Sequence, residues 1–180
     1  MKNRPKRLAR RTIYESKWIN LHVDKVEMPG GRVVEDMHVL DYPSEGVGVV
    51  VVDDEERILL EYAYRYHTGN DGWEIPAGGV DEGESVLEAG RREVLEETGY
   101  ETKDHKLVYT YNPSNGSSNQ ILNVVFCRAV RSPPRSFDAN EVREVKWFTK
   151  DEVKKLIESK EIVDGLALIG LLLFLEGLAP

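Results

Sequence analysis

Three glutamates on one predicted helix are the side chains of this sequence best suited to chemistry. At about 100° per residue, Glu93, Glu96 and Glu97 fall within an arc of about 100°, and Glu93 and Glu97 stack one turn apart. Carboxylates crowded on one face repel each other. Two interpretations follow: a solvated acidic face neutralised by Arg91 and Arg92, or a site for a hard cation such as Mg²⁺ or Mn²⁺.

The helix that carries these glutamates is well marked. Ser85 with Glu88 three residues later has the pattern of a capping box, and Gly99 is placed to end the helix, so a helix is predicted over Ser85–Thr98. A glycine-rich loop that includes Gly78 leads into it, and such loops let backbone groups approach a ligand or a metal ion. The loop favours the cation site, although spacing alone leaves both interpretations open.

Short β-rich runs must position this helix. Strands are predicted over Trp18–Met28, Arg32–Leu40, Gly46–Val52, Arg57–Tyr64, Lys106–Asn112, Gln120–Ala129 and Val142–Phe148. Further helices are predicted over Lys150–Glu158 and over Gly165–Leu175, which is apolar nearly all round. This uneven alternation predicts a mixed sheet covered by helices, in the α/β or α+β class. Pro29-Gly30-Gly31 would join the first two strands into an N-terminal hairpin that could form a separate sheet.

Composition narrows the classes of protein that fit. The chain has 180 residues, 41% hydrophobic and 31% charged, which is typical of a globular domain. Its net charge of −8 argues against binding nucleic acid through overall positive charge. The basic segment Met1–Arg11 is more often a solvated tail than an RNA contact, so we do not expect nucleic acid as a partner. The single cysteine, Cys127, excludes an intrachain disulfide framework.

The expected cell compartment depends on two kinds of segment, a signal peptide and a membrane span. No apolar stretch of signal-peptide length follows the basic N-terminus. The strongest apolar run, Leu166–Leu175, is well short of the roughly 20 residues that a membrane span needs. We therefore expect a cytoplasmic protein without a membrane partner.

The stretch Gly78–Tyr100 resembles the signature of the Nudix hydrolases, Gly-x5-Glu-x7-Arg-Glu-aliphatic-x-Glu-Glu-x-Gly-aliphatic. Its fixed positions are filled in register by Gly78, Glu84, Arg92, Glu93, Val94, Glu96, Glu97 and Gly99. Tyr100, at the last aliphatic position, is the one departure. A match at so many fixed positions is far more specific than a lone glycine motif.

The resemblance implies cleavage of a diphosphate joined to another group, with Mg²⁺ (or Mn²⁺), two or three ions per site, as the cofactor. By position, Glu93 and Glu97 would be the main metal ligands and Glu96 a ligand to a further cation. The carbonyl of Ala77 would also coordinate metal. This agrees with the charges, because cations would be needed to bring an anionic diphosphate to an acidic face, where they could clamp the reacting phosphate and the attacking water.

Other residues would act on the glutamates or on water. By resemblance, Arg92 would orient the glutamates, and Glu84 would support them or bind metal more weakly. The family subgroup discussed next carries a general base on a loop far downstream of the motif. Glu141 is the first candidate for this base and Glu144 the second, while a solvated acidic loop is the alternative interpretation.

Segments outside the motif are similar to those of ADP-ribose pyrophosphatases and related nucleoside diphosphate sugar hydrolases. Trp73–Gly78 resembles their Glu-Leu-Pro-Ala-Gly lead-in, which makes Glu74 and Gly78 candidates for substrate binding. Tyr64–Tyr66 resembles their Gln-Tyr-Arg segment, whose arginine holds a substrate phosphate. Arg65 takes that place, and a surface charge at a strand end is the alternative.

This subgroup implies a Nudix-type α/β/α sandwich with a mixed sheet over residues 45–180. It also implies an N-terminal antiparallel β extension over residues 1–44, for dimerisation and for contacts to the substrate base. Because the family exchanges this region between subunits, we expect a domain-swapped homodimer. Trp18 is the candidate for stacking on a base or sugar, and packing in the core is the alternative.

Two departures from the subgroup leave the substrate open. Ala63 stands where ADP-ribose enzymes usually have glutamine, and Asn119-Gln120 stands where they often have Asp-Glu. Amides there could bind sugar hydroxyls without adding charge, so Gln120 is a further candidate for substrate binding.

The leading hypothesis is therefore metal-dependent hydrolysis of the diphosphate bond of ADP-ribose or a related nucleoside diphosphate sugar. The products would be a nucleoside monophosphate and a sugar phosphate. One alternative is hydrolysis of GDP-mannose, UDP-glucose or dinucleotides such as FAD, and another is removal of oxidised nucleoside triphosphates. A third is a sensor that binds a nucleotide sugar without cutting it, against which the intact motif argues.

Overall fold

The computed structural model describes residues 4–131, 134–136 and 142–178. Backbone contacts divide the chain into two compact units. The N-terminal unit comprises Met1–Glu45 with Asn112–Ile121, and the larger unit comprises Gly46–Tyr111 with Leu122–Pro180. None of the helices in the described residues is long and apolar enough to cross a membrane.

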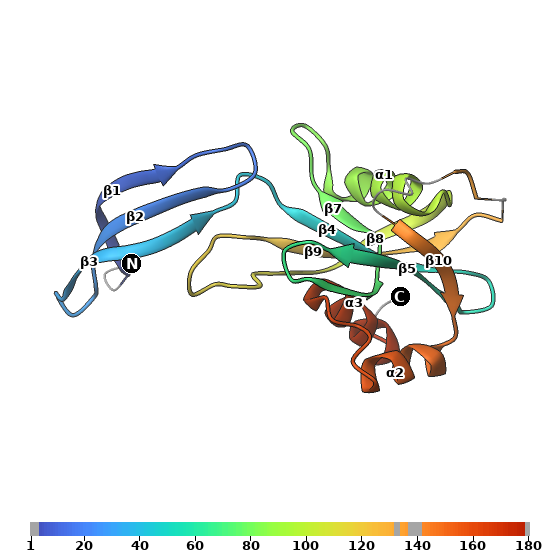
Figure 1. The fold of residues 1–180 in the computed structure, drawn as a ribbon. Coiled ribbons are helices and arrows are strands. Elements are labelled where there is room, and N and C mark those ends of the chain that lie inside the picture. The colour runs from blue at the N-terminus through green and yellow to red at the C-terminus, as the bar shows by residue number, and fades with distance from the viewer. Residues whose placement is uncertain (1–3, 132–133, 137–141, 179–180) are drawn as a thin grey trace. The chain divides into compact units, whose positions relative to one another are not determined.

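The N-terminal unit is a three-stranded antiparallel sheet (Figure 1). Its strands are β1 (Lys6–Tyr14), β2 (Asn20–Glu27) and β3 (Val33–Asp41), in the spatial order β1-β2-β3. The sequence predicted β2 and β3 as a hairpin but not β1, whose side chains are all exposed. Its Arg10 donates to the buried Asp24 of β2, with Nε–Oδ1 at 2.7 Å and Nη2–Oδ2 at 2.8 Å.

The loop Asn112–Ile121 belongs to this unit because it bonds to the end of β3. Leu40 N donates to Ser117 O at 2.9 Å. Asn119 accepts from Tyr42 N at 2.7 Å through Oδ1 and donates to Asp41 Oδ1 at 2.6 Å through Nδ2. The amide of Asn119 is thus engaged by the chain itself.

The larger unit is built on a mixed sheet with the main order β10-β5-β4-β9-β8, in which β4 and β9 run parallel. Its strands are β4 (Gly46–Val52), β5 (Ile58–Arg65), β6 (Asn70–Glu74), β7 (Ala77–Gly79), β8 (Thr102–Tyr111), β9 (Leu122–Ala129) and β10 (Val142–Phe148). Its helices are α1 (Val86–Thr98), α2 (Lys150–Glu158) and α3 (Gly165–Leu175). The three helices agree with their predicted bounds, apart from Ser85, which caps α1.

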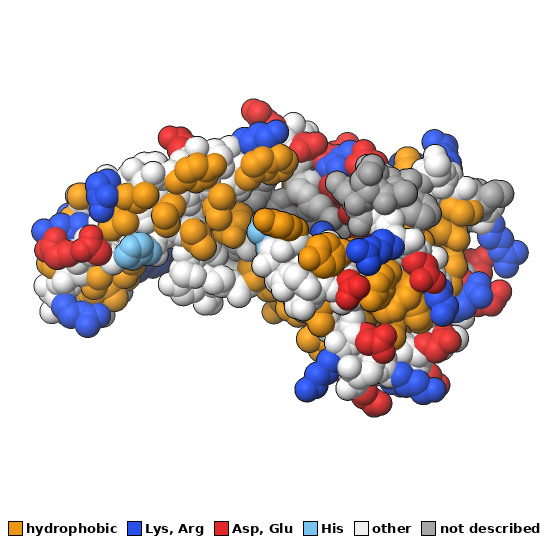
Figure 2. Space-filling model, in the orientation of Figure 1, with side chains coloured by type: hydrophobic (Ala, Val, Ile, Leu, Met, Phe, Trp, Pro, Cys, Tyr) orange, Lys and Arg blue, Asp and Glu red, His pale blue; other side chains and the backbone are white. Residues whose placement is uncertain are grey.

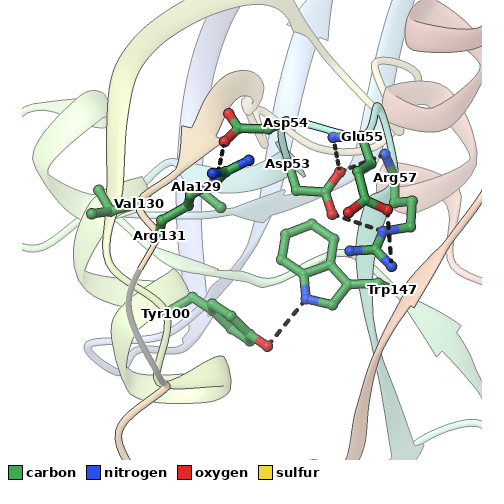
Figure 3. Close-up of a pocket in the computed structure, with 9 residues that line it drawn as sticks. All are labelled: Asp53, Asp54, Glu55, Arg57, Tyr100, Ala129, Val130, Arg131 and Trp147. Carbon is green, nitrogen blue, oxygen red and sulfur yellow. Dashed lines mark hydrogen bonds and ion pairs between the residues drawn. The ribbon is translucent and has the colours of Figure 1, made fainter.

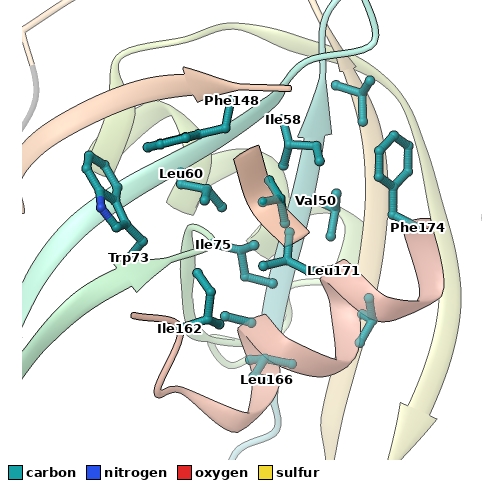
Figure 4. Close-up of a cluster of buried hydrophobic side chains, with 14 of the residues drawn as sticks. Val50, Ile58, Leu60, Trp73, Ile75, Phe148, Ile162, Leu166, Leu171 and Phe174 are labelled. Atoms are coloured by element: carbon teal, nitrogen blue, oxygen red, sulfur yellow. The ribbon is translucent and has the colours of Figure 1, made fainter. Parts of the chain in front are cut away.

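Both faces of this sheet are covered, which confirms the predicted fold class. Figure 1 shows α1 on one side of the sheet and α2 and α3 on the other. Alternate residues of β4 point to opposite faces of the sheet. Val49 packs with Val94 of α1 on one face. Val50 packs with Leu171 of α3 on the other (Figure 4). This explains why β4 is a continuous run of valines.

The short strand β7 separates most of β4 from β5. It pairs with β4 at Gly46–Gly48, whereas β4 pairs with β5 only between Val52 and Ile58. Between these points Val49 N donates to Pro76 O at 2.9 Å. Strand β7 is therefore the last strand of the sheet before α1 in sequence, and its pairing with β4 brings the backbone of Ala77 close to the helix.

Candidate active site

Both ends of α1 are fixed by the residues that predicted them. Ser85 Oγ accepts from Glu88 N at 3.3 Å, and the Glu88 carboxylate accepts from Ser85 N at 2.9 Å. At the other end Gly99 adopts φ 73° and donates to Leu95 O at 3.0 Å. With Val94 facing the sheet, the helix holds its glutamates in a defined rotational position.

Strand β7 and helix α1 meet through two carboxylates. Glu97 is 7% exposed, and its Oε2 accepts from Ala77 N at 2.8 Å. A Cβ on Gly78 would lie 2.0 Å from Glu93 Oε1, so Glu93 occupies the space that glycine leaves free. Both predicted main ligands thus lie against the same three-residue strand.

Arg92 ties the start of the motif to the helix. Its Nη1 donates to Glu93 Oε1 at 2.7 Å, and its Nη2 donates to Gly79 O at 2.9 Å. It also holds Glu84, with Nη2–Oε2 at 2.9 Å and Nε–Oε1 at 3.1 Å, and so keeps the pKa of Glu84 below its usual range. Because this guanidinium bridges Glu84 and Glu93, it can position the carboxylates without lining the pocket described next.

A cavity of about 330 Å³ opens beside Glu93 and Glu97. It is lined by Glu61, Ala63, Tyr64, Arg65, Ala77, Gly78, Glu93 and Glu97. Of the predicted site residues it brings together Arg65, Ala77, Gly78, Glu93 and Glu97. Acidic and basic groups therefore share one pocket that is formed by β5, β7 and α1.

Arg65 is held at this pocket by a buried partner. Its Nε donates to Glu74 Oε2 at 2.9 Å and its Nη2 donates to the same oxygen at 2.5 Å. Glu74 is 2% exposed, and the ion pair raises the pKa of Arg65 above its usual range. Glu74 thus lies behind Arg65 rather than in the lining of the cavity.

The other predicted residues of the larger unit lie away from the cavity lining. The Glu96 side chain is 60% exposed, and its Oε2 lies 3.4 Å from Arg92 Nη1. Glu144 is an exposed residue of β10 that aligns with Tyr62 of β5. Glu141, the first candidate for the base, lies outside the described residues.

Trp18 and Gln120 are both part of the N-terminal unit. The Trp18 side chain is 73% exposed, contrary to its interpretation as a core residue, and Lys17 Nζ lies 4.4 Å from the ring centroid. Gln120 is half-buried, and its backbone oxygen accepts from Asn112 Nδ2 at 2.7 Å.

Sequence reasoning missed Glu61, a carboxylate in the lining of the cavity. It is 1% exposed and lies two residues after Leu59, on the face of β5 that α1 covers. The signal in the sequence was a charged residue directly after the apolar run Ile58–Leu60. Such a residue in a buried strand is costly unless a partner or a ligand stabilises it.

The electrostatics of the cavity favour a bound cation. Burial is the main cause that raises the pKa of Glu97 to about 9, and the charges of Glu61 and Glu93 raise it further. The Ala77 N–H and the Arg65 charge oppose this rise without cancelling it. A divalent cation would stabilise the ionised carboxylates at neutral pH.

The donor set also fits a hard cation, because carboxylate and carbonyl oxygens are the ligands of Mg²⁺ and Mn²⁺. Glu93, Glu97 and the Ala77 carbonyl would hold it. Among the residues that the structure describes, no three Asp, Glu, His or Cys side chains are already closed around one metal position.

A second cavity, of about 170 Å³, explains the departure at Tyr100 (Figure 3). Trp147 Nε1 donates to the Tyr100 hydroxyl at 3.1 Å, and the two rings meet edge to face with centroids 5.3 Å apart. The arginines that line this cavity are paired with carboxylates, Arg57 with Asp53 at 2.8 Å and Arg131 with Asp54 at 2.6 Å. Tyr100 thus makes an aromatic contact at a position where the motif has an aliphatic residue.

Comparison with known families gives two matches that together cover most of the chain. Residues 43–166 match the model of the NUDIX domain. Residues 5–40 match the model of the nucleoside diphosphate sugar hydrolase N-terminal domain. The second match coincides with the three strands of the N-terminal unit.

Individual proteins are also similar. The chain is 32% identical over 162 residues to a CMP-5'-(N-acetyl-N-hydroxy-3-aminopropyl)phosphonate hydrolase of Streptomyces rubellomurinus, covering 90% of this chain and 78% of that one. It is 32% identical over 162 residues to an ADP-ribose pyrophosphatase of Bacillus subtilis, covering 89% and 86%. A crystal structure of an ADP compounds hydrolase has the same fold, with a TM-score of 0.83 at 22% identity over 97% of this chain and 94% of that chain.

Proposed function

This chain belongs to the Nudix family and is a Nudix pyrophosphatase, and from this premise we propose that it hydrolyses the diphosphate bond of ADP-ribose or a related nucleoside diphosphate sugar. The products would be a nucleoside monophosphate and a sugar phosphate. The observation that carries the proposal is the shared cavity, in which Arg65 lies with Glu93 and Glu97. A site for a diphosphate needs a cationic side chain that binds the phosphate oxygens. It also needs acidic side chains that bind the metal ion.

Each residue then has a defined task. Glu93, Glu97 and the Ala77 carbonyl would hold a divalent cation, which would supply positive charge for the diphosphate and for the attacking water. Arg92 keeps Glu93 in place through its 2.7 Å bond. Arg65, fixed by Glu74, binds a substrate phosphate.

Three further roles are proposed on the resemblance. Glu96 is exposed and would bind an additional cation. Glu141 or Glu144 would accept a proton from the attacking water. Gly78 would contact the substrate at the cavity wall. Trp18 and Gln120 are the candidates for contacts to a base or a sugar.

The substrate class is the part of the proposal that needs the widest test. The two relatives at 32% identity are named for different substrates, ADP-ribose and a CMP-linked phosphonate. A common element is a nucleotide whose phosphate is joined to a second group. We therefore place ADP-ribose first and include other nucleotide conjugates as alternatives.

Product release from a substrate panel tests the function. The panel contains ADP-ribose, GDP-mannose, UDP-glucose, FAD, 8-oxo-dGTP and a CMP-linked phosphonate, each with Mg²⁺ and with EDTA. We expect AMP and ribose phosphate in equal amounts from ADP-ribose, only with Mg²⁺, measured by chromatography. Preference for another conjugate would keep the chemistry and change the substrate. Tight binding without any cleavage would favour the sensor.

The surface of the N-terminal unit supports the proposed homodimer. Large apolar side chains are exposed on it, among them Leu8, Ile13, Tyr14 and Val33. Figure 2 shows hydrophobic side chains gathered over this sheet on the face in view. Exposed patches of this kind mark association surfaces, and exchange of this unit between two copies would cover them.

Sedimentation measures this directly. We expect a particle of about twice the chain mass of 20.5 kDa. The double variant Leu8→Asp and Ile13→Asp should shift it toward the monomer, because it places charges on the apolar surface. A wild-type monomer at micromolar concentration would contradict the proposed dimer.

A further inference from the structure

The cavity contains one carboxylate that the signature motif does not supply. Glu61 lies on β5, seventeen residues before the motif glycine Gly78, and is 1% exposed. It lines the same cavity as Glu93 and Glu97 of α1. Three carboxylates from two elements therefore line one cavity.

The carboxylates that line this cavity outnumber its cations. The cation that shares its cavity is Arg65, whose Nε and Nη2 both donate to Glu74. The charge of Arg65 also interacts with Glu61 and Glu97, so it serves several carboxylates at once. Arg92, the arginine of the motif, bonds to Glu93 and Glu84. The cavity thus retains an excess of negative charge.

Burial makes such an excess expensive. A buried carboxylate destabilises the fold unless a counter-charge or a metal ion compensates it. Valine or leucine would continue the apolar run Ile58–Leu60 at no such cost. A charge retained at this position is therefore expected to serve a ligand of the cavity.

We propose that Glu61 is an additional ligand of the metal centre and helps Glu93 and Glu97 hold a divalent cation in the cavity. This inference rests on the proposed function. It assigns the centre a carboxylate from the sheet in addition to those from the helix. The rival explanation is that Glu61 only balances the charge of Arg65, in which case metal affinity would not depend on it.

Titration with Mn²⁺ separates the two explanations. The full-length protein is compared with Glu61→Gln, Glu93→Gln and the control Glu158→Gln, by calorimetry and by the electron paramagnetic resonance signal of free Mn²⁺. Glutamine matches glutamate in shape and removes its charge, and Glu158 is an exposed residue of α2. We expect Glu61→Gln to weaken Mn²⁺ binding about 10-fold or more, as loss of a metal-supporting group does, while Glu158→Gln leaves it unchanged.

Thermal unfolding gives a readout that is independent of catalysis. In EDTA, Glu61→Gln should melt at the wild-type temperature or above it, because one of several buried like charges is gone. Added Mn²⁺ should raise the melting temperature of the wild type more than that of the variant. A lower melting temperature in EDTA, with unchanged Mn²⁺ affinity, would favour the ion pair with Arg65 and overturn the proposal.

The variants also separate this inference from the proposed function. If Glu93→Gln loses Mn²⁺ and Glu61→Gln binds it as the wild type does, the role of Glu61 is wrong and the metal centre stands. If the wild type binds no Mn²⁺, or Glu93→Gln binds it normally, both the metal centre and the role of Glu61 are wrong.

Discussion

Glu97→Gln is expected to lower turnover of the best substrate by at least ~10²-fold to 10³-fold, the loss typical when a group that stabilises transition-state charge is removed. Glu97 is the most buried of the three motif glutamates on α1, and it lines the cavity. A glutamine oxygen can still accept the Ala77 N–H that now lies 2.8 Å from Glu97 Oε2. The variant therefore keeps the local fold and loses the charge, and steady-state kinetics with Mg²⁺ measure the effect.

The matched control for this variant is Glu82→Gln. Glu82 lies in the same acidic segment but is exposed and occupies no fixed position of the motif. It loses the same charge, so its activity should stay close to that of the wild type. Glu97→Gln activity within a few-fold of the control would remove Glu97 from the metal centre.

In EDTA, the pH dependence of the melting temperature should differ between the wild type and the same variant. The folded pKa of Glu97 is raised to about 9 from an ordinary value of 4.5, so the folded state retains a proton that the unfolded state has released between these values. This contribution to stability is fully present below the unfolded pKa and is lost as pH rises through the folded pKa. Wild-type melting temperature should fall across this window more steeply than that of Glu97→Gln. Parallel curves would contradict the assignment.

Gly78→Ala is expected to lower turnover about 100-fold, because a misplacement of about 1 Å in a catalytic group can have that effect. An added Cβ would lie 2.0 Å from Glu93 Oε1, so the carboxylate must move. The backbone of Gly78 does not adopt a positive φ, and alanine is compatible with it. The effect should therefore appear in turnover and Mn²⁺ affinity, with little change in melting temperature.

The neighbouring glycine provides the control. A Cβ on Gly79 would meet nothing within 4 Å, and Gly79 too lacks a positive φ. Alanine keeps the backbone oxygen that accepts from Arg92 at 2.9 Å. Gly79→Ala should thus behave as the wild type, and equal losses in both variants would mean that the loop backbone, rather than the position of Glu93, is responsible.

Local signals in the sequence were sufficient for the helix that carries the motif. Ser85, Glu88 and Gly99 act within one turn of the helix ends, so their effect needs no knowledge of the rest of the fold. The valine run of Gly46–Val52 similarly predicted a strand, which is β4 in the structure. For the cavity, the resemblance supplied Arg65, Ala77, Gly78, Glu93 and Glu97, and all of them line it.

The features that were missed depend on distant partners. Strand β1 has no buried side chain and is held by pairing with β2. An alternation of buried and exposed residues therefore does not mark it in the sequence. Strand β7 has three residues, and its position follows from pairing with β4. The role of Glu61 becomes visible only with Glu93 and Glu97 of α1, which follow it by 32 and 36 residues and line the same cavity. Such relations require the folded chain.

The chain passes between its two units three times, once at Glu45–Gly46 and again at both ends of Asn112–Ile121. During synthesis, Asp41 and Tyr42 can therefore meet Asn119 only after a further 78 and 77 residues, respectively, have been added to the chain. For the same reason a truncation before Gly46 would not excise a module. It would leave the loop Asn112–Ile121 without the backbone partners that it now has at Leu40, so the N-terminal segment and this loop can only be removed or replaced together.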